Sequence, residues 1–332
     1  MRYFLGADIG GTKTHQIIAD ETGRVTGFGE SGPGNHQSVG YAGMLKTLQD
    51  GLGRASAMTG ISVEQFSGAG FGIAGYDWPS EKPEMEATIR QLGLDCPFYL
   101  VNDSIPGLVA GAEGGWGVGL VSGTGCNCRG WDKDHRREGR VTGYGTLMAE
   151  AAGSSELVAR AIQLVGYAWS KRIAPTALTG AFVAYAGAKN VQDLLENYTE
   201  GRHTIGADAA RLVFQVAENG DAAARELIRW AGVELGQLAC AVIRQLEFEL
   251  LEFDVVLAGS MFEGGAMLIE PLRETILAVA PKARLVRLTV PPVIGAVLIG
   301  MQEGGLRPDP VIRQALIESY ATLHNAAQLP GD

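Results

Sequence analysis

The segment Asp8-Ile9-Gly10-Gly11-Thr12-Lys13-Thr14 gathers a carboxylate, two glycines, hydroxyl groups and a lysine between two short apolar runs. Runs of this length bounded by turn residues predict a strand, a tight turn and a second strand. Glycine lets backbone N–H groups converge on a bulky anion such as phosphate. Asp8 beside such a turn makes sense if a hard cation such as Mg²⁺ lies between the carboxylate and the phosphate. A plain hairpin around Gly-Gly is the alternative.

A second carboxylate, Asp103, follows the apolar run from Phe98 to Asn102. Side chains at the carboxyl end of a strand commonly reach a ligand-binding crevice. Phosphoryl transfer needs a group that takes the proton of the acceptor, and a carboxylate can do so. The alternative is a helix N-cap, for which aspartate is favoured. Taken alone the position favours the cap, whereas a phosphate site elsewhere in the chain favours the general base.

The composition limits the classes of protein that need to be considered. The 332 residues are enough for two domains, and the net charge of −10 argues against a nucleic-acid or anionic-membrane partner. No apolar run has membrane-spanning length, and the N-terminus does not have the pattern of a signal peptide. Four cysteines are too few for a disulfide framework, and Cys126-x-Cys128 has no second pair for zinc. We therefore expect a cytoplasmic protein.

The order of the elements predicts an α/β chain in which one pattern occurs twice. A strand, a polar turn and a second strand at the N-terminus return from residue 118, where the turn is Ser122-Gly123-Thr124-Gly125. A third turn of the same character, Ala258-Gly259-Ser260, follows another apolar run. The predicted strands are 3–8, 14–19, 24–30, 68–74, 98–102, 118–121, 126–131, one near 140–142, 253–257 and 284–289. The predicted helices are 39–58, 83–92, 105–112, 154–169, 175–187, 190–197, 207–218, 221–247, 266–279, 294–303 and 310–325.

This duplication of topology predicts two similar domains with a nucleotide in the cleft between them. We place the first domain at 1–117 and the second at 118–305. Packing of a last helix within 308–325 on the first domain is compatible with this division. The run from Gly70 to Gly75 matches the dinucleotide pattern G-x-G-x-x-G, but no helix opens directly after it. We therefore do not interpret this run as a nucleotide site.

The three turns, with several shorter motifs in the same order, resemble the actin-like ATPase superfamily, which includes the hexokinases. Within it the chain is similar to the N-acetylglucosamine kinases and the BadF/BadG/BcrA/BcrD-type ATPases. The motifs that carry the resemblance are Asp8 to Thr14, Gly34-Asn35-His36, Val101-Asn102-Asp103, Ser122 to Arg129, Gly143-Tyr144-Gly145, Leu257 to Ser260 and Gly295-Ala296. The resemblance implies an α/β fold of two actin-like, ribonuclease H-like domains with an interdomain nucleotide cleft.

The resemblance also implies roles for individual residues. Asp8 would hold Mg²⁺, largely through water, and Asp103 would be the general base. The ATP-binding residues would be Gly10, Gly11, Thr12, Lys13, Ser122, Gly123, Thr124, Gly125, Gly259 and Ser260. The substrate-binding residues would be Asn35, Asp103, Cys126, Asn127, Gly143, Tyr144, Gly145 and Glu150.

One departure from the pattern concerns the sugar site. The related kinases typically carry Gly-Asp-Glu-Gly-Ser, whereas this chain reads Ala149-Glu150-Ala151-Ala152-Gly153-Ser154, with one extra residue and Glu in place of Asp. The function we expect is an ATP-dependent kinase of N-acetylglucosamine or a related amino sugar. The alternatives are an ATPase that activates a partner enzyme and a non-catalytic sugar or nucleotide sensor. A homodimer is compatible with the sequence, which does not fix the oligomeric state.

Overall fold

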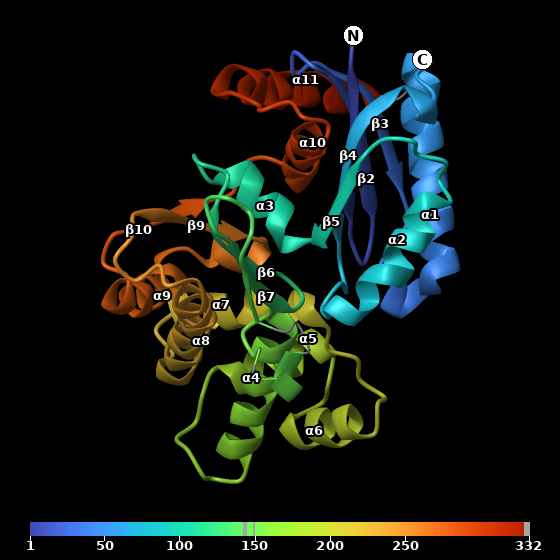
Figure 1. Ribbon diagram of the computed structural model, residues 1–332. Helices are drawn as coiled ribbons and strands as arrows, with labels where there is room; N and C mark the ends of the chain where they lie inside the picture. Colours follow the sequence, from blue (N-terminus) through green and yellow to red (C-terminus); the bar gives the residue numbers. More distant parts are fainter. Residues whose placement is uncertain (142–144, 149, 329–332) are drawn as a thin grey trace. The chain divides into compact units, whose positions relative to one another are not determined.

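The structure is a computed structural model that describes residues 1–141, 145–148 and 150–328 (Figure 1). It contains two compact units, which we describe separately. The first unit comprises residues 1–119, residues 129–138 and the chain from residue 286 onward. The second unit comprises residues 120–128 and 139–285.

The first unit is built on a five-stranded sheet with the order β3-β2-β1-β4-β5. Its strands are β1 (Tyr3–Ile9), β2 (Thr14–Asp20), β3 (Val25–Ser31), β4 (Phe66–Ile73) and β5 (Phe98–Asn102). β1 pairs antiparallel with β2 and parallel with β4, which in turn pairs parallel with β5. The register aligns Ile9 with Ile73, and Ile73 with Asn102. The carboxyl ends of three parallel strands therefore lie at one edge of this sheet.

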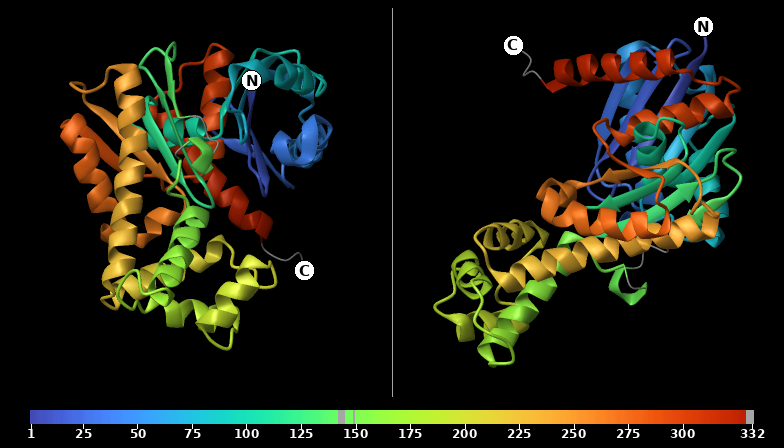
Figure 2. Two further views of the ribbon diagram at one scale, coloured as in Figure 1. Left: turned by 90° about the horizontal axis from the view of Figure 1, so that it is seen from below. Right: turned by 90° about the vertical axis from the view of Figure 1, so that its left-hand side faces the viewer.

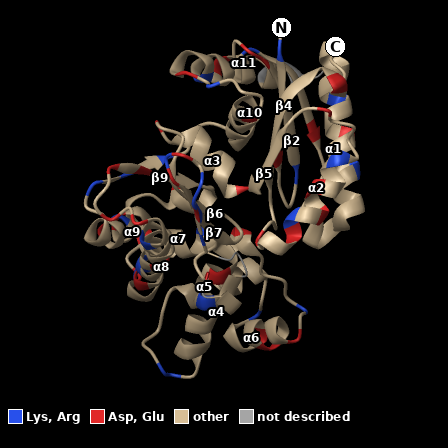
Figure 3. Ribbon diagram, viewed as in Figure 1, with Lys and Arg blue, Asp and Glu red and all other residues tan. Residues whose placement is uncertain are grey.

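Helices α1 (His36–Thr59) and α2 (Lys82–Arg90) cover one face of this sheet (Figure 1). Every second residue of β1 and β4 faces these helices, and the apolar side chains of α1 and α2 close the core around them. The strand residues are Leu5, Ala7, Ile9, Ala69, Phe71 and Ile73, and the helix residues are Met44, Leu48, Leu52, Ala55, Met85 and Ile89. β4 carries no charged residue and is tan in Figure 3.

The other face of the sheet is packed by α10 (Pro292–Glu303) and α3 (Ser104–Gly111). The intervening residues of β4 are glycines, and they let the helix backbones come close. A Cβ at Gly70 would lie 2.1 Å from the carbonyl oxygen of Ala296, and one at Gly72 would lie 2.4 Å from the Pro106 ring. The glycines that resemble a dinucleotide motif therefore serve the packing of helices on a strand.

The second sheet has the order β10-β9-β6-β7-β8, which repeats the order of the first sheet. Its strands are β6 (Gly117–Ser122), β7 (Cys126–Trp131), β8 (Glu138–Arg140), β9 (Phe253–Ala258) and β10 (Ala283–Arg287). The helices of the second unit are α4 (Ser154–Trp169), α5 (Leu178–Ala186), α6 (Val191–Thr199), α7 (Ala210–Glu218), α8 (Ala222–Leu246) and α9 (Ala266–Val279). The predicted duplication of topology is thus confirmed. Figure 2 shows the long α8 from two further directions.

The compact units divide the chain at other points than the domains 1–117 and 118–305 that the sequence suggests. The segment 129–138 and helix α10 lie in the first unit, since α10 packs on β1, β4 and α3. The last helix, α11 (Pro310–Gln328), also packs there. The Ser319 hydroxyl accepts a hydrogen bond from the backbone N–H of Val25 at 2.9 Å.

The contact between β4 and α10 gives a prediction about stability. Gly70→Ala should destabilise the protein by about 3 kcal/mol, because the new Cβ meets the backbone of α10, which cannot rotate away. Gly53→Ala is the matched control: Gly53 lies exposed on α1, and a Cβ there meets no atom within 4 Å. The control should be stabilised by roughly 0.5–1 kcal/mol, the difference in helix propensity. Urea unfolding of both variants measures these changes, and equal stabilities would contradict the packing argument.

Candidate functional site

Asp8 is the first of the predicted site residues, and it lies near the carboxyl end of β1. The alternation of β1 places its side chain on the face that α10 covers, opposite Ala7 and Ile9. Burial and the negative charge of Asp103 raise the pKa of Asp8 to about 7, and the positive charge of Lys13 opposes that rise. Asp8 and Asp103 therefore interact as like charges within the first unit.

The turn after Asp8 has the predicted form. The N–H of Gly10 donates to the carbonyl oxygen of Lys13 at 3.0 Å, and Gly11, Thr12 and Lys13 are exposed. The loop before α1 is fastened to this turn, because the N–H of Gly34 donates to the carbonyl oxygen of Gly10 at 3.0 Å. An exposed turn held by its neighbours in this way can receive an anion.

Asp103 follows β5 and occupies the N-cap position of α3, as the alternative interpretation required. Its carboxylate nevertheless makes no capping hydrogen bond. Asn102 takes this part, since its side-chain oxygen accepts from the N–H of Ser104 at 3.1 Å and from the Ser104 hydroxyl at 2.7 Å. Burial and the charge of Asp77 raise the pKa of Asp103 to about 6, and Arg129 opposes the rise. A carboxylate with this pKa is ionised at neutral pH and can still accept a proton.

Asn35 belongs to the same unit and is the N-cap of α1. Its side-chain oxygen accepts from the N–H of Gln37 at 2.9 Å. The same amide group lies against Gly75, where a Cβ would be 2.4 Å from the Asn35 oxygen. Asp8, the Gly10–Lys13 turn, Asn35 and Asp103 are therefore all positioned by the first unit, although the sequence separates them by as many as 95 positions (103 − 8).

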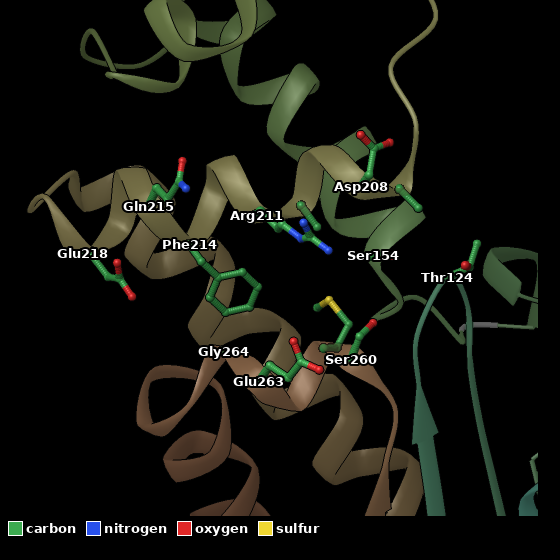
Figure 4. A pocket seen from close by; sticks show the side chains of 13 residues that line it. Thr124, Ser154, Asp208, Arg211, Phe214, Gln215, Glu218, Ser260, Glu263 and Gly264 are labelled. Atoms are coloured by element: carbon green, nitrogen blue, oxygen red, sulfur yellow. The ribbon is translucent and has the colours of Figure 1, made fainter. Parts of the chain in front are cut away.

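A cavity of about 450 Å³ lies in the second unit (Figure 4). Two of the predicted nucleotide-binding residues line it, Thr124 from the turn after β6 and Ser260 from the turn after β9. Arg211 and Phe214 project toward them from α7 (Figure 4). The remaining lining residues are Ser154, Ala207, Asp208, Ala210, Gln215, Glu218, Met261, Glu263 and Gly264.

Gly259 explains how the two turns come together. Its φ is +109°, which favours glycine, and a Cβ there would lie 2.2 Å from the carbonyl oxygen of Ser122. The Ser122 hydroxyl is buried and donates to the carbonyl oxygen of Ala152 at 2.9 Å, so it is engaged within the unit. Gly123 closes the turn by donating to the carbonyl oxygen of Gly125 at 2.9 Å.

The predicted sugar-binding residues of the second unit are only partly accessible. Cys126 and Cys128 are buried on one face of β7, with Asn127 partly buried on the other. Burial, with the charges of Glu156 and Glu150, raises the pKa of the Cys126 thiol to about 11. This thiol is therefore protonated at neutral pH and is a poor nucleophile.

Glu150 is fully buried and accepts from the N–H of Gly145 at 2.9 Å. It thereby holds the short 3-10 helix Gly145–Met148 in place. Gly143 and Tyr144 lie outside the described residues. Residues 1–141, 145–148 and 150–328 contain no group of three or more His, Cys, Asp and Glu side chains placed to hold a metal. In the same residues no helix is long and apolar enough to cross a membrane.

Comparison with known families adds to this geometry. Residues 5–300 match the BadF/BadG/BcrA/BcrD ATPase family, which is most of the chain. The chain belongs to this family.

Two relatives of this BadF/BadG/BcrA/BcrD family member align over nearly its whole length. It is 27% identical over 306 residues to the N-acetylmuramic acid/N-acetylglucosamine kinase of Clostridium acetobutylicum, covering 91% of this chain and 99% of the relative. It is 24% identical over 312 residues to the N-acetyl-D-glucosamine kinase of Dictyostelium discoideum, covering 90% and 97% of the two chains.

Solved structures show the same fold. A candidate N-acetylglucosamine kinase from Chromobacterium violaceum matches with a TM-score of 0.64 and 25% identity, over 90% of this chain and 99% of that one. A ROK family glucokinase from Streptomyces griseus, solved with glucose and AMPPNP, matches with a TM-score of 0.54 and 19% identity, over 90% and 99% of the two chains. The predicted actin-like α/β fold and the predicted family are thus confirmed.

Sequence reasoning missed two groups of residues in this family member. Helix α7 contributes Arg211, Phe214 and Gln215 to the cavity, and no motif marks them. Asp77 and Arg129 form a buried ion pair with 3.4 Å between Nη2 and Oδ1. The available signal was Arg129 itself. An arginine within a predicted apolar strand indicates a buried partner of opposite charge.

The pKa of Asp8 predicts a pH-dependent change in stability. Its pKa is raised from about 3.8 unfolded to about 7 folded. The folded state therefore binds more protons than the unfolded state between these values, and the free energy of unfolding falls as pH rises through that window. Asp8→Asn removes this loss. The variant should be more stable than the parent at pH 8, by roughly 2 kcal/mol, given a limit of about 1.4 kcal/mol per pKa unit.

The two proteins should be nearly equally stable at pH 4, where the carboxyl group is protonated in the folded state. Denaturant unfolding at both pH values, with EDTA present to remove divalent cations, measures the difference. Asp50→Asn is the control: it removes an exposed carboxylate of α1 that pairs with Lys46, and its stability at pH 8 should fall by no more than about 1 kcal/mol. A variant that is less stable than the parent at pH 8 would show that the Asp8 charge is well accommodated.

Proposed function

We propose that this chain is an ATP-dependent sugar kinase, and that its acceptor is an amino sugar such as N-acetylglucosamine. The observation that carries the proposal is the similarity, over 91% of the chain, to a kinase named for N-acetylmuramic acid and N-acetylglucosamine. Asp103 supports it, because its carboxylate makes no capping hydrogen bond to α3, while hydrogen bonds from the backbone of Asp103 and Ser104 hold down the rise in its pKa.

In the proposed reaction Asp103 is the general base. The oxygen of the acceptor hydroxyl forms a bond to the γ-phosphorus of ATP, the bond from that phosphorus to the bridging oxygen breaks, and ADP leaves. The hydroxyl proton passes to the carboxylate of Asp103. Its pKa of about 6 suits this task, because a base near the working pH is both ionised and able to hold a proton.

Asp8 fits a role beside Mg²⁺. Its carboxylate is repelled by the negative charge of Asp103, and a divalent cation close to Asp8 would offset this repulsion. Mg²⁺ usually keeps several waters and uses one or two carboxylates together with substrate phosphates. We therefore assign Asp8 to the hydration shell of a magnesium ion that is held mainly by ATP. The ion would neutralise charge on the transferred phosphoryl group.

We assign phosphate binding to two turns, each within its own unit. In the first unit it is the Gly10–Lys13 turn, and in the second unit it is the turn of Gly123, Thr124 and Gly125. The nucleoside would enter the cavity lined by Ser260 and the α7 side chains, where Phe214 offers an aromatic face and Arg211 a cation. Ser122 would act through its backbone only, because its hydroxyl is bonded to Ala152.

We assign the acceptor to Asn35, Asn127, Gly143, Tyr144, Gly145 and the environment of Cys126. Glu150 would act indirectly, because its buried carboxylate holds the N–H of Gly145. The departure from the Gly-Asp-Glu-Gly-Ser pattern would then change how this loop is held, while the acceptor is still contacted from the same segment.

A direct assay tests the proposal. ADP release from ATP should require both Mg²⁺ and a sugar, and N-acetylglucosamine or N-acetylmuramic acid should exceed glucose in kcat/KM. Phosphorylation of the sugar should match the ADP released. ATP hydrolysis that is independent of every sugar would instead favour an ATPase that activates a partner, and binding without turnover would favour a sensor.

Asp103→Asn tests the role of the base. The rate of transfer should fall by about 10²–10⁴-fold, the usual contribution of general base catalysis. The affinity for ATP should change little, because the carboxylate is assigned to the acceptor. Measuring kcat for sugar phosphorylation and the Kd of a non-hydrolysable ATP analogue separates the two effects. Near-parent turnover of this variant would leave Asp103 with a structural part only.

Gly264→Ala tests the nucleotide cavity. A Cβ at Gly264 would lie 2.2 Å from the Phe214 ring, so the ring must move within the cavity. The KM for ATP should rise on the order of tenfold, which corresponds to about 1.4 kcal/mol, while the KM for sugar stays near that of the parent. Gly180→Ala on α5, where a Cβ meets no atom within 4 Å, is the matched control. An unchanged KM for ATP with a raised KM for sugar would place the nucleotide elsewhere.

A further inference from the structure

Arg129 is the largest of the fully buried side chains and has no established part in the proposed reaction. Its Nη2 lies 3.4 Å from Oδ1 of Asp77 and 3.3 Å from the carbonyl oxygen of Tyr76. Its Nη1 lies 3.2 Å from Oε1 of Glu138. Its Nε is buried without a hydrogen-bond partner. A guanidinium that is so completely removed from water is costly unless it is paired, so its retention calls for an explanation.

The Tyr76 carbonyl connects Arg129 to the residues on either side of Asp103. It accepts from Arg129 Nη2 at 3.3 Å and from the side-chain nitrogen of Asn102 at 3.1 Å. Asn102 uses its other side-chain atom to hold the N–H and hydroxyl of Ser104. The backbone around Asp103 is thus fixed by Asn102, and Asn102 is in turn fixed by the carbonyl that Arg129 binds.

Asp77 fastens the same loop to the start of α1. Its Oδ2 accepts from the side-chain nitrogen of Gln37 at 3.0 Å, and that nitrogen also donates to the carbonyl oxygen of Gly75 at 3.1 Å. The N–H of Asp77 donates to Oε2 of Glu81 at 2.9 Å. The loop from Gly75 to Asp77 is therefore held at both ends, and Asp77 forms its ion pair with Arg129 from this loop.

We propose that Arg129 and Asp77 are positioning residues for Asp103, which hold its carboxylate in place and set the balance of charge around it during proton transfer. The inference rests on the proposed sugar kinase function. Arg129 touches neither the acceptor nor ATP in this account, and it acts through Tyr76 and Asn102 and through its charge.

The charged groups around Asp103 oppose one another. Asp77 raises the pKa of Asp103, next after burial, and Arg129 lowers it. Asp8 on β1 is the further carboxylate whose pKa responds to Asp103, and Lys13 lies beside Asp8. Removing either member of the pair should therefore move the proton affinity of Asp103, and the two removals should move it in opposite directions.

The experiment is the pH profile of kcat/KM for the best sugar of the panel, at saturating ATP and Mg²⁺. Arg129→Met removes the cation and should move the acid limb of the profile up by about one pH unit, the lower end of the effect of a neighbouring charge. Asp77→Asn should move the limb down. At pH values below the acid limb of the parent, a shift of the limb by one pH unit changes kcat/KM about tenfold.

Two further variants separate this effect from damage to the fold. The double variant Arg129→Met/Asp77→Asn leaves no unpaired buried charge, and its limb should lie between those of the single variants. Asp254→Asn breaks a partly buried ion pair with Arg284, where Nε and Oδ1 are 2.9 Å apart in the second unit. It should lower the melting temperature without moving the limb. Single variants that lose activity equally at every pH would overturn the inference.

A measurement without turnover keeps this inference distinct from the proposed function. With its raised pKa, Asp103 should make the parent lose melting temperature relative to Asp103→Asn as pH rises from about 4 to about 6. In the Arg129→Met background that window should extend upward by about one pH unit. A parent protein that phosphorylates no sugar would refute the proposed function alone. An unchanged window in the Arg129→Met background would refute the electrostatic part of the inference.

Discussion

Desolvation of carboxylates that lie near one another is the constraint on which the first unit depends. Asp8 and Asp103 lie at or just beyond the carboxyl ends of β1 and β5, which the register of the sheet aligns. Both have raised pKa values because water is excluded and other carboxylates are near. Such an arrangement lowers the stability of the protein alone at neutral pH. It is expected where a site is prepared for a cation or a proton, since functional sites often hold groups that the isolated fold would not favour.

Two cationic side chains partly neutralise this negative charge, and they differ in their surroundings. Lys13 lowers the pKa of Asp8 and is exposed on a turn. Its side chain is therefore free to move when an anion or a metal ion binds. Arg129 is buried, contacts Asp77, Glu138 and the Tyr76 carbonyl, and lowers the pKa of Asp103. The side assigned to ATP and Mg²⁺ thus has an adaptable partner, whereas the side assigned to the base has a fixed one. This difference agrees with a base that must keep one orientation through every turnover.

The sequence was sufficient for the duplicated topology because each half opens with a strand, a Gly-rich turn and a strand, and local periodicity marks such elements. It also placed Asp8 and Asp103, which stand at or next to strand ends. It could not place α10 in the first unit, because that depends on glycines 200 or more positions earlier in the chain. Gly70 and Gly72 leave space on β4, and only the structure shows that helices α10 and α3 fill it.

The rest of the site escaped prediction because contacts between segments that are distant in the sequence create it. Arg129 and Asp77 are 52 positions apart, and Arg211 and Phe214 reach the cavity from a helix with ordinary composition.

The turn after β6 shows the same point. Its Ser122 hydroxyl is bonded inward, and its geometry is set by the N–H groups of Ser154 and Ser155, which donate to Gly123 and Thr124 at 2.8 and 3.0 Å. The first turn of α4 therefore holds this turn through the main chain. Side-chain type identifies the turn in the sequence, but main-chain hydrogen bonds give it the shape that could receive a phosphate.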